Sequence, residues 1–128
     1  MIKASELRIG NWIIDRTYTT PQEECIDINT FHLIAINEDV LELYSPIPLT
    51  KELLLKFGFK ENRKGYCKFI DWTKGAYNNK SRRNFVIRFS NKDNYRIEMQ
   101  SMAITIVRYV HELQNIYFAL TGEALIYE

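Results

Sequence analysis

The chain has 128 residues, of which 46% are hydrophobic and 26% are charged. This size and composition are typical of one globular domain, which we expect to span residues 1–128, and they exclude a disordered or low-complexity chain. The first residues lack the apolar core of a signal peptide, and no later run approaches the roughly 18 apolar residues of a membrane span. The sequence therefore predicts a cytoplasmic protein with no membrane partner.

The net charge is only +1, but the charges are segregated along the chain. Residues 1–59 contain 5 Lys/Arg and 9 Asp/Glu, residues 60–96 contain 11 and 3, and residues 97–128 contain 1 and 4. The three net charges are −4, +8 and −3. A basic segment of this size fits an anionic partner, and it fits equally well with neutralisation by the acidic segments on either side.

The β-rich part, residues 1–45, is expected to contain four short strands separated by turns. The expected strands are residues 11–16, 25–28, 31–36 and 40–44, with a hairpin turn at 37–39. The third run, FHLIAI, is nearly all apolar, as in a strand that is buried on both faces. These strands predict a small antiparallel sheet or an SH3-like half-barrel, a structural analogy that carries no function.

Residues 46–59 are predicted to form an extended strap followed by a short helix. Pro46 and Pro48 keep the residue before each of them out of the helical region. Thr50 is a good N-cap for a helix over residues 51–57, and Gly58 supplies its C-terminal stop.

The basic segment, residues 60–104, is predicted to form a three-stranded antiparallel sheet. Its expected strands are residues 66–72, 85–90 and 95–100, while residues 102–104 fit either a further strand or the approach to a helix. Alternate residues of a strand share a face, and the side chains expected to face the core are Phe85, Ile87, Phe89, Tyr95, Ile97 and Met99.

The pairing register of the last two strands stays open between two alternatives. In one register Phe89 pairs with Tyr95, and Arg88 lies opposite Arg96, which is unfavourable unless an anion or a carboxylate lies nearby. A shift of two residues pairs Arg88 with Glu98 and neutralises that face. Both registers keep the apolar residues on one face, so the hydrophobic pattern does not choose between them.

The C-terminal part, residues 105–128, is predicted to be a helix from 105 to 120 and a tail. An apolar stripe at helical spacing comprises Ile106, Val110, Leu113, Tyr117 and Leu120. The opposite polar stripe comprises Arg108, His111, Glu112 and Asn115. These polar residues suit an interaction surface, or they anchor the helix to a neighbouring loop. The expected fold is therefore α+β, with the C-terminal helix packed on the sheet.

Three segments resemble the shared blocks of one protein family: residues 7–13 (LRIGNWI), residues 46–59 (PIPLTKELLLKFGF) and residues 109–123 (YVHELQNIYFALTGE). The family consists of uncharacterised small proteins encoded in the genomes of gut anaerobes, often in phage-like or mobile regions. The resemblance implies a bacterial or phage protein of the cytoplasm, and it implies no activity.

The spacing of chemically reactive residues predicts neither an enzyme nor a metal protein. Cys25 and Cys67 are expected to be buried, reduced thiols far apart in the sequence. His111 and Asn115 have the spacing of a two-histidine helical zinc motif, but an amide is a poor zinc ligand. The sequence contains no phosphate-binding glycine pattern and no nucleophile elbow. We therefore expect no catalytic residue, no cofactor, no metal and no small-molecule substrate.

Nucleic acid is the leading predicted partner, because the basic residues of segment 60–96 are interleaved with aromatic residues. Cationic side chains bind phosphates, and an exposed aromatic ring stacks on a base. The candidate contact residues are Lys80, Arg82, Arg83, Arg88 and Arg96.

The alternative is a module that binds another protein or a second copy of itself. It would use the acidic N-terminal part, or the polar stripe of the last helix, and opposite charges of two copies would pair. A continuous basic surface with exposed Tyr or Trp favours nucleic acid, whereas neutralisation of Arg88 by Asp or Glu favours the alternative.

Overall fold

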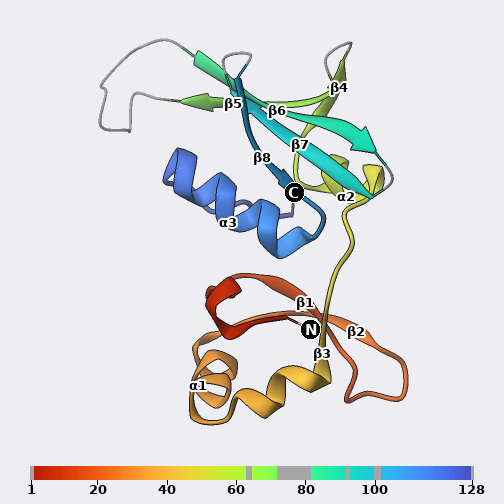
Figure 1. The fold of residues 1–128 in the computed structure, drawn as a ribbon, viewed down its shortest axis with the longest axis vertical. Coiled ribbons are helices and arrows are strands. Elements are labelled where there is room, and N and C mark those ends of the chain that lie inside the picture. Colours follow the sequence, from red (N-terminus) through yellow and green to blue (C-terminus); the bar gives the residue numbers. More distant parts are fainter. Residues whose placement is uncertain (1, 63–64, 72–81, 92, 100–101, 128) are drawn as a thin grey trace. The chain divides into compact units, whose positions relative to one another are not determined.

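The structure is a computed structural model that describes residues 2–62, 65–71, 82–91, 93–99 and 102–127. The fold is α+β, as predicted, with one three-stranded and one five-stranded antiparallel sheet (Figure 1), and no barrel closure is found among the described strands. The chain divides into unit 1, Met1–Pro48 with Tyr109–Asn115, and unit 2, Leu49–Arg108 with Ile116–Glu128. Helix α3 (Val110–Thr121) contributes residues to both units. The assignment of the whole chain to one domain stays a prediction.

The sheet of unit 1 contains β1 (Trp12–Asp15), β2 (Gln22–Cys25) and β3 (Tyr44–Pro46) in the order β2-β1-β3. A short 3-10 helix, η1 (Ala4–Glu6), precedes it. The buried core of this unit comprises Ile2, Leu7, Ile13, Ile26, Ile34 and Leu41. A small antiparallel sheet is therefore present, and its likeness to an SH3-like half-barrel stays a prediction.

Three of the four strands predicted for this part are wrong: residues 28–36 and 38–43 are helical, and the observed β2 ends at Cys25, where the predicted strand 25–28 begins. Helix α1 (Ile28–Ile36) replaces the predicted strand 31–36, and the 3-10 helix η2 (Glu38–Leu43) replaces the strand 40–44. The carboxylate of Asp27 caps α1 by accepting a hydrogen bond from the Thr30 amide at 2.8 Å. The run FHLIAI is apolar except for His32, and a short apolar run does not distinguish a buried strand from a helix.

Helix α2 (Lys51–Lys56) confirms the predicted short helix. The Thr50 hydroxyl accepts a hydrogen bond from the Leu53 amide at 3.2 Å, which makes Thr50 the expected N-cap. Gly58 has a φ of 87°, a left-handed conformation that suits glycine at the end of a helix.

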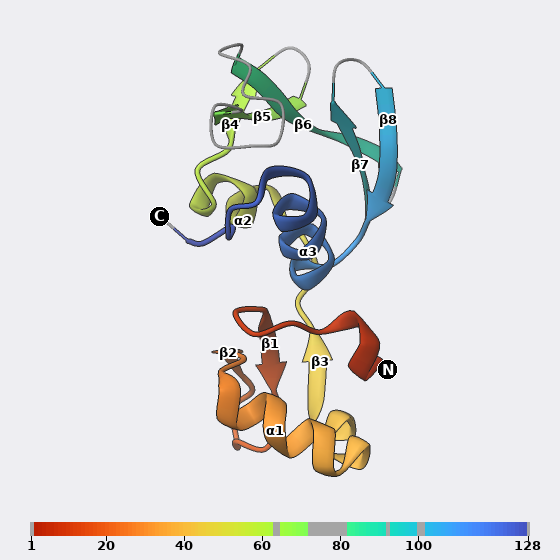
Figure 2. The same cartoon turned by 90° about the vertical axis from the view of Figure 1, so that its left-hand side faces the viewer.

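The sheet of unit 2 has five strands, so the prediction of three is incomplete. The strands follow one another in the sheet in chain order (Figure 2). They are β4 (Lys60–Asn62), β5 (Gly65–Asp71), β6 (Arg82–Asn91), β7 (Asn94–Met99) and β8 (Met102–Val107). Strands β5 to β7 are the three that were predicted, β4 adds one edge, and residues 102–104 prove to be part of a strand.

The β6–β7 hairpin adopts the first of the two predicted registers. Phe89 lies opposite Tyr95, and Arg88 lies opposite Arg96. The inward face is confirmed for five of the six residues: Phe85, Ile87, Tyr95, Ile97 and Met99 are buried. The prediction for Phe89 is wrong, because its side chain is 60% exposed. The ladder is irregular between Phe89 and Asn91, and the Phe89 ring contacts the Tyr95 ring at the end of the hairpin.

Helix α3 begins five residues later than predicted, because residues 105–107 belong to β8. The β-branched run of residues 104–107, ITIV, favours a strand, and the helical spacing of Ile106 was accidental. The carboxylate of Glu112 accepts a hydrogen bond from the Tyr109 amide at 3.1 Å and so caps the helix where it begins. Within unit 2, the Tyr117 ring of this helix packs on the Phe85 ring of β6, with centroids 5.1 Å apart.

Candidate functional site

Of the five residues predicted to bind nucleic acid, the structure describes the side chains of Arg88 and Arg96. Lys80 lies outside the described residues. Arg82 and Arg83 begin strand β6, opposite Asp71 and Ile70 of β5. Arg88 and Arg96 lie further along the sheet, on neighbouring strands.

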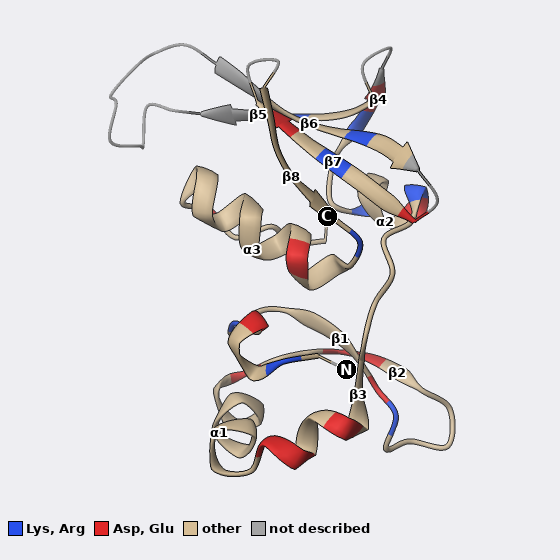
Figure 3. Ribbon diagram, in the orientation of Figure 1, with Lys and Arg blue, Asp and Glu red and all other residues tan. Residues whose placement is uncertain are grey.

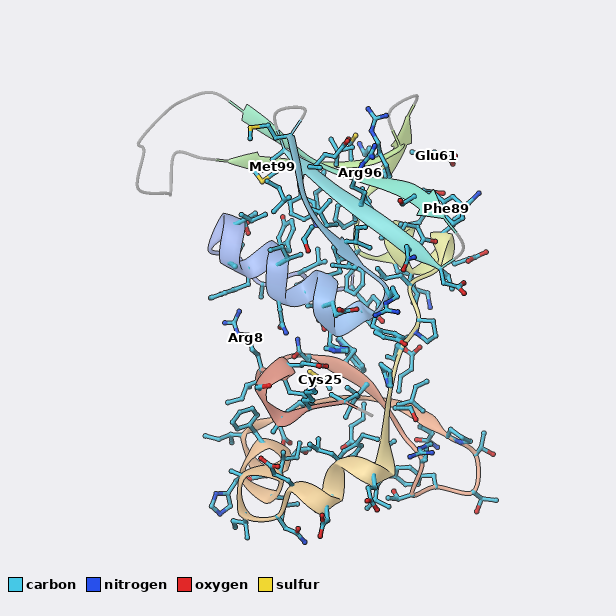
Figure 4. All side chains as sticks on the ribbon, viewed as in Figure 1. Arg8, Cys25, Glu61, Phe89, Arg96 and Met99 are labelled. Carbon is cyan, nitrogen blue, oxygen red and sulfur yellow. The ribbon has the colours of Figure 1, made fainter. Side chains whose placement is uncertain are left out.

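Arg88 and Arg96 share a single carboxylate, that of Glu98 on β7 (Figure 4 labels Arg96). Arg88 Nε lies 2.5 Å from Glu98 Oε2, and Arg96 Nη2 lies 3.1 Å from Glu98 Oε1. The Arg88 and Arg96 side chains are 41% and 43% exposed, whereas the Glu98 side chain is 13% exposed. The carboxylate offsets the repulsion between the two opposite arginines, and this part of the face keeps a net charge of about +1.

Other members of the basic and aromatic segment are unavailable to a ligand. The Lys68 ammonium donates a hydrogen bond to the Phe57 carbonyl oxygen at 2.7 Å and lies 5.9 Å from the centroid of the Phe59 ring. Tyr66 and Tyr95 are buried. Phe89 is the one exposed aromatic residue of segment 60–96 among those whose burial the structure describes.

The polar stripe predicted on the last helix mainly anchors that helix within unit 1. Asn11 Nδ2 donates to Asn115 Oδ1 at 2.9 Å, and the Gln114 side chain accepts from the Trp12 amide at 2.9 Å. Asn115 Nδ2 in turn donates to the Glu6 carbonyl oxygen at 2.6 Å. Asn11 and Gln114 are buried, and the sequence offered no signal for this network beyond its amide-rich composition. Of the other residues in this stripe, Arg108 is exposed, whereas Glu112 and Asn115 are half-buried.

His111, the fourth residue of the stripe, is buried, so the prediction of a polar helix face is wrong here. Its side chain is 1% exposed, and neither ring nitrogen has a hydrogen-bond partner among the described residues. The Glu6 carboxylate lies 3.5 Å from Nε2, and the Tyr109 ring stacks on the imidazole. Burial lowers the pKa of His111 and outweighs Glu112 and Glu6, which raise it. The imidazole is therefore neutral near pH 7.

A pair of carboxyl groups that sequence reasoning missed lies on the sheet of unit 1. Burial raises the pKa of Asp15, but hydrogen bonds from Thr17 and Glu24 outweigh it and lower the pKa overall. The hydrogen bond to Asp15 raises the pKa of Glu24, with help from burial. Glu24 Oε2 is buried and accepts no N–H or O–H among the described residues. The pKa values of the two neighbouring carboxyl groups on β1 and β2 are therefore shifted in opposite directions.

The described residues contain no group of three or more His, Cys, Asp and Glu side chains that could hold a metal ion.

Cys67 is buried as predicted, but the prediction for Cys25 is wrong, because this thiol is exposed at the end of β2. In the part of the chain that is described, no helix has both the length and the apolar character needed to span a bilayer. A hollow of about 360 Å³ lies between η1 and η2, lined by Lys3, Glu38, Asp39 and Glu42 among others.

Helix α1 exposes large aliphatic side chains, and we call Ile28, Leu33 and Ile36 the α1 face. They are 69%, 55% and 69% exposed, and at 100° per residue they lie within about 140° of the helix circumference. The helix contains no charged residue (Figure 3). A helix on the surface of a globular protein normally turns a charged or polar stripe to water, whereas the exposed side of α1 has only Asn29 and His32 as polar residues between these aliphatic side chains.

The outer strand β8 carries three exposed apolar residues, Met102, Ile104 and Ile106, which we call the β8 edge. These side chains are 66%, 43% and 53% exposed. Ile106 shares the outward face with its opposite residue Arg96, whereas Met102 lies opposite the buried Met99, because the register shifts between them. Strand β8 ends the sheet and pairs only with β7 among the described strands. Natural edge strands are usually protected by Lys, Pro or strong twisting, and Met102–Val107 contains neither Lys nor Pro.

Comparison with known proteins identifies no relative. No protein-family model, no curated protein and no solved structure matches this chain. The function of the chain must therefore be inferred from the surfaces described above.

Proposed function

We propose that this chain is a non-enzymatic binding module of phage or mobile-element origin and that its ligand is a protein surface. The α1 face is the observation that carries the proposal. Single exposed aliphatic side chains are ordinary, but a group of large ones on an uncharged helix is typical of a surface that a partner covers. The three segments that resemble the mobile-element family support the proposed origin.

The exposed area of the α1 face is large enough to support binding. Complete burial of one large aliphatic side chain contributes about 1.5–3 kcal/mol. The exposed fractions of Ile28, Leu33 and Ile36 are 69%, 55% and 69%, so covering all three contributes about 3–6 kcal/mol. That range corresponds to a factor of roughly 10² to 10⁴ in affinity. The α1 face therefore suits the apolar centre of an interface, with polar contacts around it.

Nucleic acid is the second candidate, and the charge of unit 2 favours it. This unit contains 14 Lys/Arg and 7 Asp/Glu, a net charge of +7. Nucleic acid ranks second because Glu98 neutralises part of the charge of Arg88 and Arg96, and because Lys68 turns toward aromatic rings. A continuous cationic surface was the feature that would have favoured it.

Site-specific photo-crosslinking in the producing cell tests the protein-surface proposal. A photoreactive phenylalanine analogue replaces Ile36 of the α1 face, and the same analogue at Tyr18 is the control, because Tyr18 is an exposed residue of unit 1 outside the face. We expect a discrete protein adduct from position 36 and none from position 18. The adduct counts only if Ile28→Asp with Leu33→Asp abolishes it while the circular dichroism spectrum stays unchanged.

Anisotropy of labelled single-stranded and duplex oligonucleotides, measured over a salt series, tests the second candidate. Micromolar binding that weakens with salt, and weakens again in a triple alanine variant at Lys80, Arg82 and Arg83, would establish nucleic acid as a ligand. If such binding occurs and position 36 gives no adduct, the protein-surface proposal is wrong. An adduct at position 36 without oligonucleotide binding supports it.

A further inference from the structure

Resting on the proposed function, we infer that the partner of the α1 face is a second copy of this chain, which binds through its β8 edge. The contact is head-to-tail: unit 1 of one copy meets unit 2 of the next. Two properties of the described surfaces lead to this pairing, namely their exposed aliphatic side chains and the opposite charges around them.

The α1 face is surrounded by acidic residues. Asp27 immediately precedes the helix, and Glu38, Asp39 and Glu42 follow it on η2, where Figure 3 shows them in red; all four are exposed. Unit 1 contains 3 Lys/Arg and 9 Asp/Glu, a net charge of −6. A surface that fits the α1 face therefore needs an apolar centre with basic side chains beside it.

The β8 edge meets this requirement. Ile106 lies directly opposite Arg96 in the β7–β8 register, and Arg96 lies opposite Arg88. Both arginine side chains remain about two-fifths exposed beside Glu98, so Ile106 of the β8 edge has basic residues next to it. Unit 2 as a whole carries +7, against −6 for unit 1.

The same charges disfavour symmetric dimers. Two α1 faces in contact would bring two acidic units together, and two β8 edges in contact would bring two basic units together. Opposite charge patterns steer association and suppress the pairing of like surfaces. The head-to-tail contact is the one arrangement of these two faces that satisfies both apolar burial and charge.

One contact between these two different faces leaves one free α1 face and one free β8 edge. The assembly therefore grows with concentration unless two copies pair reciprocally or a larger ring closes. The average mass should therefore rise steadily with concentration and fall with added salt, which screens the charge pairing.

Sedimentation velocity of the full-length chain tests this inference with two interface variants and two matched controls. Ile36→Lys blocks the α1 face, because the new cation would meet the basic groups beside the β8 edge, and Ile106→Asp blocks the β8 edge, because the new anion would meet the acidic residues beside the α1 face. Ile9→Lys and Ile126→Asp introduce the same charges at other exposed isoleucines of units 1 and 2, which are 58% and 63% exposed. We expect each interface variant to weaken association by roughly tenfold or more, and the controls to assemble like the wild type.

Mixing the two interface variants gives the decisive result. The Ile36→Lys protein retains its β8 edge and the Ile106→Asp protein retains its α1 face, so together they can form one contact. We expect two monomeric variants that yield a 1:1 dimer on mixing and no larger species. A variant that still assembles alone would establish a symmetric contact and overturn the inference.

The failure of this inference and the failure of the proposed function give different results. A wild-type chain that stays monomeric at all concentrations, while position 36 crosslinks to a different protein, overturns only the second-copy inference. A monomeric chain with no adduct at position 36 overturns both. An adduct with twice the mass of the chain supports both.

Discussion

The amide network that anchors α3 within unit 1 should be a main source of stability, and Asn11→Ala measures it. Asn11 Nδ2 donates to Asn115 Oδ1 at 2.9 Å and to Gln114 Oε1 at 3.4 Å, and Asn11 Oδ1 accepts from the Arg8 amide at 2.7 Å. Asn11 is only 3% exposed, so water can replace the lost hydrogen bonds only by entering the cavity that the smaller side chain leaves. Two good hydrogen bonds contribute about 1 kcal/mol each, and buried partners without a bond cost a further 1–3 kcal/mol. We expect a total loss of about 2–4 kcal/mol.

The isosteric variant Asn11→Asp separates hydrogen bonding from packing. It keeps the acceptor for the Arg8 amide but turns a carboxylate oxygen toward two amide oxygens, so it should be at least as destabilising as Asn11→Ala near pH 7. Rotation of the Asn115 amide does not rescue the pair, because it would break the 2.6 Å bond to the Glu6 carbonyl oxygen.

Urea unfolding monitored by circular dichroism provides the measurement, with Asn29→Ala as the control. Asn29 is exposed on α1, and its truncation should change the free energy of unfolding by less than about 0.5 kcal/mol. If Asn11→Ala is as stable as Asn29→Ala, or if Asn11→Asp matches the wild type, the network does not stabilise the unit and the reasoning fails.

Three further perturbations follow from the geometry. Gly65→Ala should destabilise by about 2 kcal/mol or more in urea unfolding, because φ is 121° and the new Cβ would lie 2.4 Å from a backbone oxygen of β6. Burial lowers the folded-state pKa of His111 below its unfolded value of 6.5, so its stabilising effect is present above pH 6.5 and is lost as the pH falls toward the folded pKa. His111→Gln should remove this decline, and the exposed His32→Gln should keep it. Phe85→Ala should cost about 3–5 kcal/mol in thermal unfolding, whereas Phe89→Ala should cost well under half of that, since the side chains are 0% and 60% exposed; equal losses would contradict the burial assigned to them.

The sequence was sufficient where local signals and packing agree. The Thr50 cap and the Gly58 stop are local signals, and α2 forms where they place it. Alternation located β6 and β7, because every second residue of the hairpin meets the same core. The sequence did not predict which register the hairpin adopts. Glu98 pairs with Arg88 diagonally across the two strands, so this ion pair also forms in the register in which Arg88 lies opposite Arg96.

The candidate surfaces were harder to predict, since exposure depends on what the rest of the chain covers. Segment 60–96 predicted a cationic surface from composition, but composition does not reveal that Lys68 turns toward aromatic rings or that Glu98 binds two arginines. The amides of Asn11 and Gln114 are more than 100 residues apart in the chain, and no local pattern predicts their contact.

The error at residues 31–36 has the same physical origin as the proposed interface. The segment is apolar except for His32, so its sequence alone indicates nearly complete burial, yet the fold leaves His32, Leu33 and Ile36 exposed. Natural sequences are locally consistent with their folds, and departures from that consistency concentrate at functional sites. A β8 edge from a second copy would cover the α1 face and remove the conflict. If Ile36→Lys leaves assembly unchanged, and Ile28→Asp with Leu33→Asp leaves the adduct at position 36 unchanged, the exposed helix needs a different explanation, because an uncovered aliphatic face of this size promotes nonspecific aggregation and has no stabilising role in the isolated chain.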